Sequence, residues 1–211
     1  MHRNTPEEMQ VGPRADLTIV LAHGRGRSPD DMRALARQLD VHNVRYLFLV
    51  ADNSTWYPKL FQDPLDDNEP SLSAAIAHYD SVIADLEASG TPASQIVVGG
   101  FSQGACLTAE FLARHPRRFA AAVLWTGGLI GPEGTQWPVQ PTLKDLPVFL
   151  STSETDPWVP PPRVRETHAW LQASGASAAM LIFQEREHGV LEEEVLAVRR
   201  MIERARLEVA A

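Results

Sequence analysis

The most constraining feature of this sequence is a regular alternation of short apolar runs with longer helical stretches. The runs have strand length and are rich in Val, Leu, Ile and Phe, which is typical of a parallel sheet covered on both faces. The expected strands are Leu17–Ala22, Val44–Ala51, Gln95–Gly99, Phe119–Trp125, Val148–Ser151 and Ala178–Phe183. The expected helices are Ser28–Leu39, Ser71–Ser89, Ser102–Arg114, Pro161–Ala173 and Val190–Leu207. This order predicts an α/β fold with a mostly parallel central sheet and helices on both faces.

The length of the chain limits how many domains it can form. Its 211 residues suit one domain of ordinary to large size, and the expected strands and helices use nearly all of them. We expect residues 1–15 to be an N-terminal extension and residues 16–211 to form a single domain. The remaining length leaves no room for a separate cap domain.

Charge and cysteine content exclude several classes of protein. The 19 Lys and Arg residues stand against 27 Asp and Glu, and the resulting charge of −8 disfavours binding to nucleic acids or anionic membranes. A lone cysteine, Cys106, permits neither an internal disulfide nor a thiolate metal cluster, and we expect it to be a small buried residue. No apolar run approaches the roughly 18 residues of a membrane span, and the first residues do not resemble a signal peptide. The sequence therefore predicts a cytoplasmic protein.

One short motif indicates a nucleophile. Residues 100–104 read G-F-S-Q-G and lie between an expected strand and an expected helix. In a nucleophile elbow of the form G-x-S-x-G, the chain turns sharply at the serine, and small residues two positions away let the strand and helix pack closely. The hydroxyl then projects from the turn, with the N-terminus of a helix behind it. We predict that Ser102 is a nucleophile rather than a helix-capping serine.

An elbow of this type needs an acid and then a histidine downstream. His188 follows the strand Ala178–Phe183 and precedes a glycine, whereas His168 falls inside a helical pattern, so we predict His188 as the general base. Glu154 and Asp156 both follow the strand Val148–Ser151. We favour Asp156 because the proline after it restrains the chain. The histidine would take the serine proton, and the aspartate would orient the imidazole.

Acyl transfer also needs two donors for the oxyanion of the tetrahedral intermediate. The backbone N–H of Gln103, directly after the nucleophile, is one candidate. The other is the N–H of Arg25, in the H-G-R-G-R-S segment that follows the first expected strand. A phosphate-binding loop is the alternative for this segment, but it departs from G-x-G-x-x-G and lacks the P-loop lysine.

Together these motifs resemble a known family. H-G-x-G after the first apolar strand, G-F-S-Q-G, D-P-W-V-P and a late H-G are similar to the phospholipase/carboxylesterase family of small α/β-hydrolases, which includes acyl-protein thioesterases and lysophospholipases. The resemblance extends from about Leu17 to Arg206. It implies an α/β-hydrolase fold and a triad of Ser102, Asp156 and His188. It also implies an oxyanion hole from the Arg25 and Gln103 amides, and hydrolysis of carboxylic esters or thioesters without a metal or organic cofactor.

Two features separate this chain from the thioesterase branch of that family. The thioesterases usually have an apolar residue where this chain has Arg25, and an acid where it has Arg27. Their W-F-D segment is replaced here by N-S-T-W-Y-P-K-L-F. The chain therefore resembles the bacterial esterases of the family more than the enzymes that act on lipidated proteins.

Aromatic residues gather at the carboxyl ends of the expected strands, which favours an apolar acyl or aryl pocket beside the nucleophile. The candidates for this pocket are Trp56, Tyr57, Phe61, Trp125 and Trp158. We expect at least two of the tryptophans at 56, 125, 137 and 158 to cover the core instead. The side chain of Arg25 would pair with Asp30, Asp31 or Asp52, or else bind an anionic part of a substrate.

The sequence thus predicts a serine carboxylesterase that acts on short- to medium-chain or aryl esters through an acyl-enzyme. A lysophospholipase or acyl-protein thioesterase is the alternative within the same class. A dienelactone-type hydrolase is disfavoured, because its nucleophile is usually a cysteine. A non-catalytic binding module on the same fold is the alternative from another class. The expected partners are a small-molecule ester and, as a further candidate, a second copy of the chain.

Overall fold

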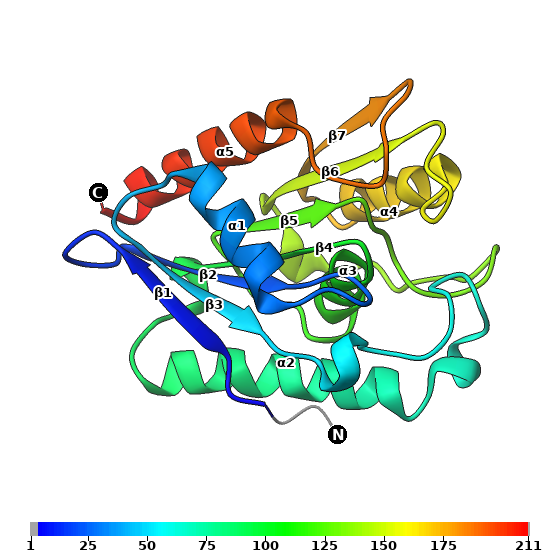
Figure 1. Ribbon diagram of the computed structural model, residues 1–211, viewed down its shortest axis with the longest axis horizontal. Coiled ribbons are helices and arrows are strands. Elements are labelled where there is room, and N and C mark those ends of the chain that lie inside the picture. The colour runs from blue at the N-terminus through cyan, green and yellow to red at the C-terminus, as the bar shows by residue number, and fades with distance from the viewer. Residues whose placement is uncertain (1–3, 211) are drawn as a thin grey trace.

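The computed structural model describes residues 4–210, which contain a seven-stranded sheet of order β1-β3-β2-β4-β5-β6-β7 (Figure 1). Only β1 is antiparallel to its neighbour, and the other described strands run parallel. The strands are β1 (Glu7–Val11), β2 (Leu17–Ala22), β3 (Val44–Leu49), β4 (Ile96–Phe101), β5 (Ala121–Trp125), β6 (Pro147–Ser153) and β7 (Ser177–Phe183). The predicted mostly parallel sheet is confirmed.

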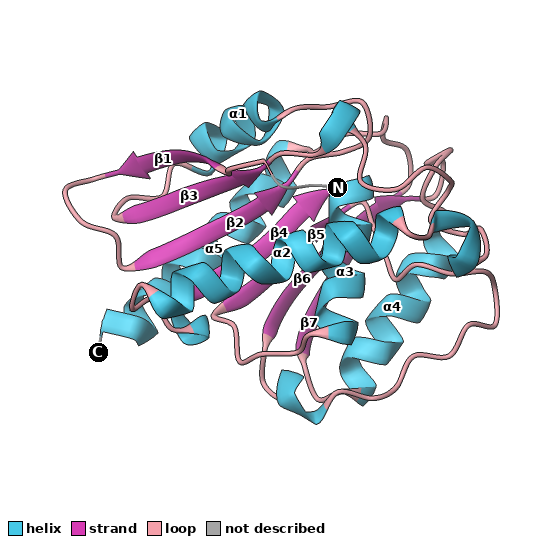
Figure 2. Ribbon diagram, turned by 90° about the horizontal axis from the view of Figure 1, so that it is seen from below, coloured by secondary structure: helices cyan, strands magenta, loops and turns pink. Residues whose placement is uncertain are grey.

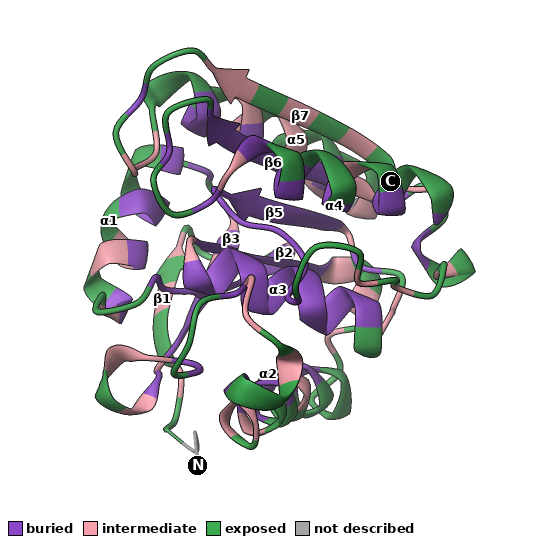
Figure 3. Cartoon of the chain, turned by 90° about the vertical axis from the view of Figure 1, so that its right-hand side faces the viewer, coloured by how far each residue is buried: buried purple, intermediate pink, exposed green. Residues whose placement is uncertain are grey.

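Helices cover both faces of this sheet, as Figure 2 shows. They are α1 (Pro29–Leu39), α2 (Ser71–Ala88), α3 (Gln103–Arg114), α4 (Pro161–Ala173) and α5 (Glu192–Ala210). One apolar cluster lies between the sheet and α1 and α5, and a larger one lies between the sheet and α2, α3 and α4. Helix α3 is buried along almost its whole length (Figure 3), so its N-terminus is held rigidly against the sheet.

The expected and observed elements differ by three residues or fewer at their ends, apart from one strand that was not predicted. Residues 7–11, within the expected N-terminal extension, form β1 and pair with β3 along the edge of the sheet. This strand is mostly exposed and charged, so it lacks the apolar signal of a buried strand. Ion pairs of Glu7 with Arg33 at 2.7 Å and of Glu8 with Arg45 at 2.8 Å fasten it to the protein. Residues 1–3 and 211 lie outside the described residues.

The parallel strands set the place of the functional loops, because their carboxyl ends share one edge of the sheet. The loops after β2, β4, β6 and β7 begin at this edge, and they carry Arg25, Ser102, Asp156 and His188. Between residues 4 and 210, no helix has the length and hydrophobicity to cross a membrane.

Candidate active site

Ser102 occupies a sharp turn between β4 and α3. Its backbone has φ 54° and ψ −119°, a conformation that costs a non-glycine residue about 1–3 kcal/mol. A Cβ on Gly104 would lie 2.1 Å from the carbonyl oxygen of Ala22, and one on Gly100 would lie 2.6 Å from the same atom. Strand β2 thus packs directly against the turn. This is the geometry of a nucleophile elbow, in which only glycine fits on either side.

The three residues of the predicted triad form one chain of hydrogen bonds. Nε2 of His188 lies 2.8 Å from Oγ of Ser102, and Nδ1 of His188 lies 2.8 Å from Oδ2 of Asp156. With the ring proton on Nδ1, the imidazole donates to the carboxylate and accepts from the serine hydroxyl. The alternative acid and the alternative base lie outside this chain of hydrogen bonds. Glu154 pairs with Arg165, and His168 is a residue of α4 whose ring contacts a backbone carbonyl.

The carboxylate of Asp156 is buried and held at both oxygens. Oδ1 accepts hydrogen bonds from the backbone N–H of Trp158 at 2.9 Å and of Val159 at 2.8 Å. Burial alone would raise the pKa of Asp156, but the hydrogen bond from His188 and the two amides together lower this pKa below its ordinary value. The residue is therefore ionised at neutral pH and can hold one orientation of the imidazole.

Sequence reasoning missed a buried arginine behind the triad. The side chain of Arg186 is 1% exposed, and its NH1 contacts both carboxylate oxygens of Glu194 on α5, at 2.8 and 2.9 Å. Its NH2 donates to Oγ1 of Thr126 at 2.7 Å and lies 3.9 Å from Oδ2 of Asp156. The arginine thus fixes the loop that carries His188 to the end of β5 and to α5.

The two candidate oxyanion donors line the same cavity as the nucleophile. The backbone amides of Arg25 and Gln103 do not donate to any acceptor within residues 4–210, and Gln103 is the first residue of α3. The side chain of Gln103 accepts from the amide of Trp56 at 3.1 Å and donates to the carbonyl of Tyr57 at 2.7 Å. It therefore fastens the loop after β3 to the elbow.

Arg25 does not pair with an acid, and that prediction is wrong. Its guanidinium donates to the backbone carbonyls of Tyr57 at 3.0 Å and Pro58 at 2.8 Å, and also to that of Lys59. The loop presents three carbonyl oxygens to one planar guanidinium. The prediction considered only nearby acids as partners and therefore missed these backbone acceptors. The charge of Arg25 consequently has no carboxylate partner among the described residues.

A cavity of about 290 Å³ opens beside Ser102. Its apolar walls come from Tyr57, Leu60, Phe61, Trp158 and Val159. Of the predicted aromatic residues, Tyr57, Phe61 and Trp158 therefore do line the cavity. Leu60 and Val159 were not predicted, because nothing in the sequence distinguishes them from other loop or core residues.

Trp56 and Trp125 do not line this cavity, contrary to their prediction as pocket residues, but in agreement with the expectation that at least two of the tryptophans cover the core. Both side chains are fully buried. The indole N–H of Trp56 donates to the carbonyl of His23 at 2.8 Å, and Trp125 packs in the cluster beneath α1 and α5. A position next to a loop does not decide which way a side chain points, and these two point into the core.

Cys106 reaches the cavity from α3, one turn after the nucleophile. It is 1% exposed, and burial raises the pKa of its thiol to about 12. The thiol is therefore neutral, which agrees with the expectation of a small buried residue. Elsewhere, no cluster of His, Cys, Asp and Glu among residues 4–210 is arranged to hold a metal ion.

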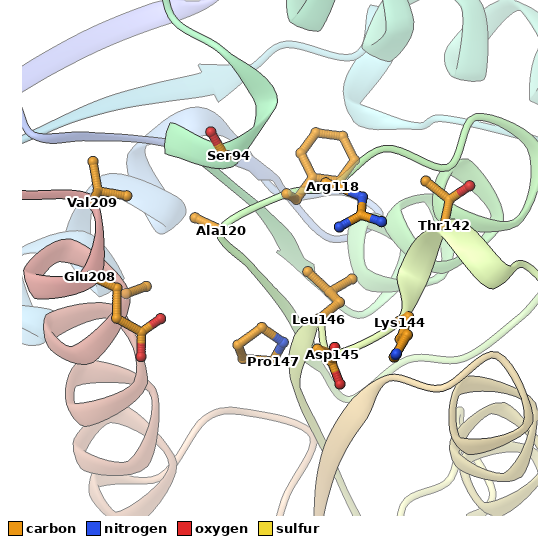
Figure 4. A pocket seen from close by; sticks show the side chains of 12 residues that line it. Ser94, Arg118, Ala120, Thr142, Lys144, Asp145, Leu146, Pro147, Glu208 and Val209 are labelled. Atoms are coloured by element: carbon orange, nitrogen blue, oxygen red, sulfur yellow. The ribbon is translucent and has the colours of Figure 1, made fainter. Parts of the chain in front are cut away.

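A second hollow, of about 310 Å³, lies at the start of β5 and β6 and the end of α5, far from the elbow (Figure 4). Ser94, Arg118, Lys144, Asp145 and Glu208 are among its lining residues, and Figure 4 shows the side chains of Arg118, Lys144, Asp145 and Glu208 around it. Its lining, all within the described chain, includes no histidine or cysteine. The predicted triad lies at the opposite edge of the sheet, where the parallel strands end.

Comparison with known proteins identifies the family to which this architecture belongs. A model of the family described as phospholipase/carboxylesterase matches residues 8–205. The chain belongs to this family. The resemblance noted from the motifs is therefore confirmed, as is the prediction of a hydrolase that acts on ester bonds.

The known proteins that resemble this chain differ in their degree of similarity to it. The crystal structure of a phospholipase/carboxylesterase from Dyadobacter fermentans is 35% identical, has a TM-score of 0.89, and matches over 96% of this chain and 98% of that one. A carboxylesterase from Bacillus cereus has a TM-score of 0.78 at 20% identity, over 96% of both chains, and shows the fold alone. Acyl-protein thioesterase 1 of Cryptococcus neoformans is 25% identical over an alignment 172 positions long, and the match covers 72% of this chain and 72% of that one.

Proposed function

We propose that this member of the family is a serine carboxylesterase that hydrolyses short- to medium-chain or aryl esters through an acyl-enzyme. The observation that carries the proposal is the continuous hydrogen-bond chain from Ser102 through His188 to Asp156, which ends beside an apolar cavity. The strained backbone of the serine and the buried carboxylate both support it, since each is maintained by several neighbouring contacts.

The proposed reaction begins when Nε2 of His188 takes the hydroxyl proton of Ser102. The serine oxygen forms a bond to the ester carbon, and the carbonyl electron pair moves to the oxygen, which the amides of Arg25 and Gln103 stabilise. The intermediate collapses, the alcohol leaves with the proton from the imidazolium, and the acyl group stays on the serine. Water, activated by the same imidazole, then releases the acid. Asp156 holds the ring and offsets its charge throughout.

The size and walls of the cavity support the proposed substrate range. Its volume of about 290 Å³ lies near the lower limit of about 300 Å³ for small-molecule sites. Apolar side chains from the loop after β3 and from the loop after β6 enclose it, which suits a short acyl or aryl group. We propose that these loops hold the substrate within the single domain of residues 16–211, without a cap domain. We also propose that the protein is cytoplasmic and that a second copy of the chain is a candidate partner in a homodimer.

A lysophospholipase or acyl-protein thioesterase is the second candidate. It is favoured by the family of the chain and by relatives described as acyl-protein thioesterase 1 in Cryptococcus neoformans and Schizosaccharomyces pombe. Values of kcat/KM on p-nitrophenyl esters of increasing chain length, compared with lysolipid and palmitoyl-thioester substrates, would separate the two. For the carboxylesterase we expect kcat/KM to be highest for acyl chains of about two to eight carbons, which is the range that a cavity of this size accepts.

Labelling with a fluorophosphonate tests the proposed nucleophile directly. We expect the wild type to gain one covalent adduct, detected by intact mass, and Ser102→Ala to gain none. Ser94→Ala is a matched control, because that exposed serine lies in the hollow at the other edge of the sheet. No labelling of the wild type would favour a non-catalytic binding module, and equal labelling of Ser102→Ala would show that another residue reacts, so either result would overturn Ser102 as the nucleophile.

A further inference from the structure

The cavity beside Ser102 is locally cationic in a protein whose net charge is −8. Arg25 and Arg27 both line it, whereas no aspartate or glutamate within residues 4–210 belongs to its lining. A site with this charge attracts anions and concentrates its field where apolar walls exclude water. The charge therefore bears on which esters the enzyme prefers, an inference that rests on the function proposed above.

The two arginines differ in how firmly their side chains are engaged. Arg25 donates to three carbonyls of the loop after β3, and these hydrogen bonds fix its guanidinium to that loop. Arg27 has a single partner among the described residues, Oδ1 of Asp31 at 3.3 Å. That pair is exposed, with 52% of the arginine side chain and 37% of the aspartate side chain accessible to solvent. Exposed pairs of this kind are weak, so Arg27 can exchange its partner for a substrate anion.

Arg27 also lies close to the nucleophile. A Cβ placed on Gly24 would lie 3.3 Å from Cβ of Ser102 and 3.4 Å from Cγ of Arg27, so that the two side chains flank the same glycine. Arg27 also lines a smaller hollow of about 190 Å³, whose lining includes Leu35, Val190 and Asp31, the carboxylate that Arg27 pairs with. Arg27 thus borders both the acyl cavity and the smaller hollow beside α1.

We propose that the enzyme prefers esters whose alcohol part carries a carboxylate or a similar anion, and that Arg27 binds this anion. The acyl part occupies the cavity with aromatic walls, and the alcohol part extends past Arg27 toward the hollow beside α1. The planar guanidinium then exchanges Asp31 for the substrate anion, with charge-assisted hydrogen bonds. The charge of Arg25, whose guanidinium forms no ion pair among the described residues, adds to the attraction.

A matched pair of substrates tests this preference. In 4-acetoxybenzoate the leaving group carries a carboxylate, and in 4-acetoxybenzamide a neutral amide replaces it with a similar shape. We expect wild-type kcat/KM to favour the anionic ester, and we expect Arg27→Gln to lower the ratio of the two values by about fivefold. Arg27→Lys keeps the charge and should retain most of the ratio. Added salt should lower the wild-type ratio, because the arginine is exposed.

Arg204→Gln is the control for loss of one positive charge, since Arg204 is an exposed residue of α5 outside the cavity. It should leave the ratio at the wild-type value. An unchanged ratio in Arg27→Gln, with both esters still hydrolysed, would overturn the anion preference alone. Failure of the wild type to hydrolyse either ester would overturn the proposed esterase function as well, so the two failures are distinguishable.

Discussion

Gln103 and Arg25 donate to the same atom, the carbonyl oxygen of Tyr57, at 2.7 and 3.0 Å. These are also the two residues whose backbone amides we propose as the oxyanion hole. Their side chains hold one wall of the cavity. If their amides form the oxyanion hole as proposed, the position of this wall and the position of the oxyanion donors are linked through the same two residues.

Replacing Gln103 by Met should separate these two roles. The backbone amide of residue 103 stays, but the amide of Trp56 loses its hydrogen bond to the side chain, and the carbonyl of Tyr57 keeps only the hydrogen bond from Arg25. Because losing a hydrogen bond at a buried polar group costs about 1–3 kcal/mol, we expect a loss of about that size in the free energy of unfolding, with a raised KM. Urea unfolding and steady-state kinetics measure both. Gln172→Met, at an exposed position of α4, is the control, and equal stability of the two variants would contradict the role assigned to Gln103.

The strained backbone of Ser102 predicts a stability difference between two inactive variants. At φ 54° and ψ −119° a glycine is relaxed, whereas an alanine is strained in the same way as the serine. We expect Ser102→Gly to be more stable than Ser102→Ala by about 1 kcal/mol, and neither to hydrolyse esters. Thermal unfolding of both proteins provides the comparison. An alanine variant as stable as the glycine variant would show that the turn relaxes in solution.

The glycines of the elbow should tolerate no side chain at all. A Cβ on Gly104 would meet the main chain of both Ala22 and His23, at 2.1 and 2.6 Å, and main chain cannot rotate away. We expect Gly104→Ala to lose about 3 kcal/mol or more of stability, or to fail to fold. Gly90→Ala is the matched control, since the space around Gly90 is open and only its φ of 96° adds a cost of about 1 kcal/mol.

Much of this site could be predicted because its signals are local and have steric causes. The parallel sheet follows from the apolar alternation, and the elbow follows from two glycines that no other residue can replace. Once the sheet is parallel, residues after different strands meet at one edge. This is why Asp156 and His188 could be predicted although they lie 54 and 86 positions after Ser102 in a chain of 211 residues.

The features that escaped prediction depend on which way a side chain points. Arg186 lies in the run E-R-E-H and Glu194 in the run L-E-E-E, and both runs read as solvent-exposed. Nothing in either pattern distinguishes the buried arginine from the exposed acids beside it. Trp56 and Trp125 failed for the same reason, since loop position and aromatic character fit a pocket and a core equally well. Strand β1 escaped because an edge strand needs few apolar residues.

The buried pair of Arg186 and Glu194 predicts that removing one of the two charges alone destabilises the fold more than removing both. Glu194→Gln leaves a charged guanidinium in an environment where its side chain is 1% exposed, and we expect a loss of about 3–5 kcal/mol. The double variant Arg186→Met, Glu194→Leu removes both charges and should recover much of that stability. Urea unfolding of the single and double variants tests this. A single variant as stable as the wild type would contradict it.

The lowered pKa of Asp156 predicts where its contribution to stability disappears. In the unfolded chain an aspartate has a pKa of about 3.9, and the hydrogen bonds from His188, Trp158 and Val159 hold the pKa of Asp156 in the folded protein below that value. A carboxylate of this kind stabilises the fold fully above its unfolded pKa, and the contribution is lost as the pH falls through the folded value. The stability advantage of the wild type over Asp156→Asn should therefore be constant from pH 8 to about 5 and shrink below about pH 4.

The same substitution should remove most of the activity while the fold persists. An asparagine cannot hold the required tautomer of the imidazole, so we expect kcat for a neutral p-nitrophenyl ester to fall by about 10³–10⁴-fold at pH 7. Asp66→Asn, at an exposed position in the loop before α2, removes an equal charge away from the site and should keep wild-type kcat. Since Oδ1 and Oδ2 of Asp156 receive different partners, the two readouts test different bonds. A variant that keeps wild-type kcat but loses stability would show that Asp156 supports its loop without acting through His188.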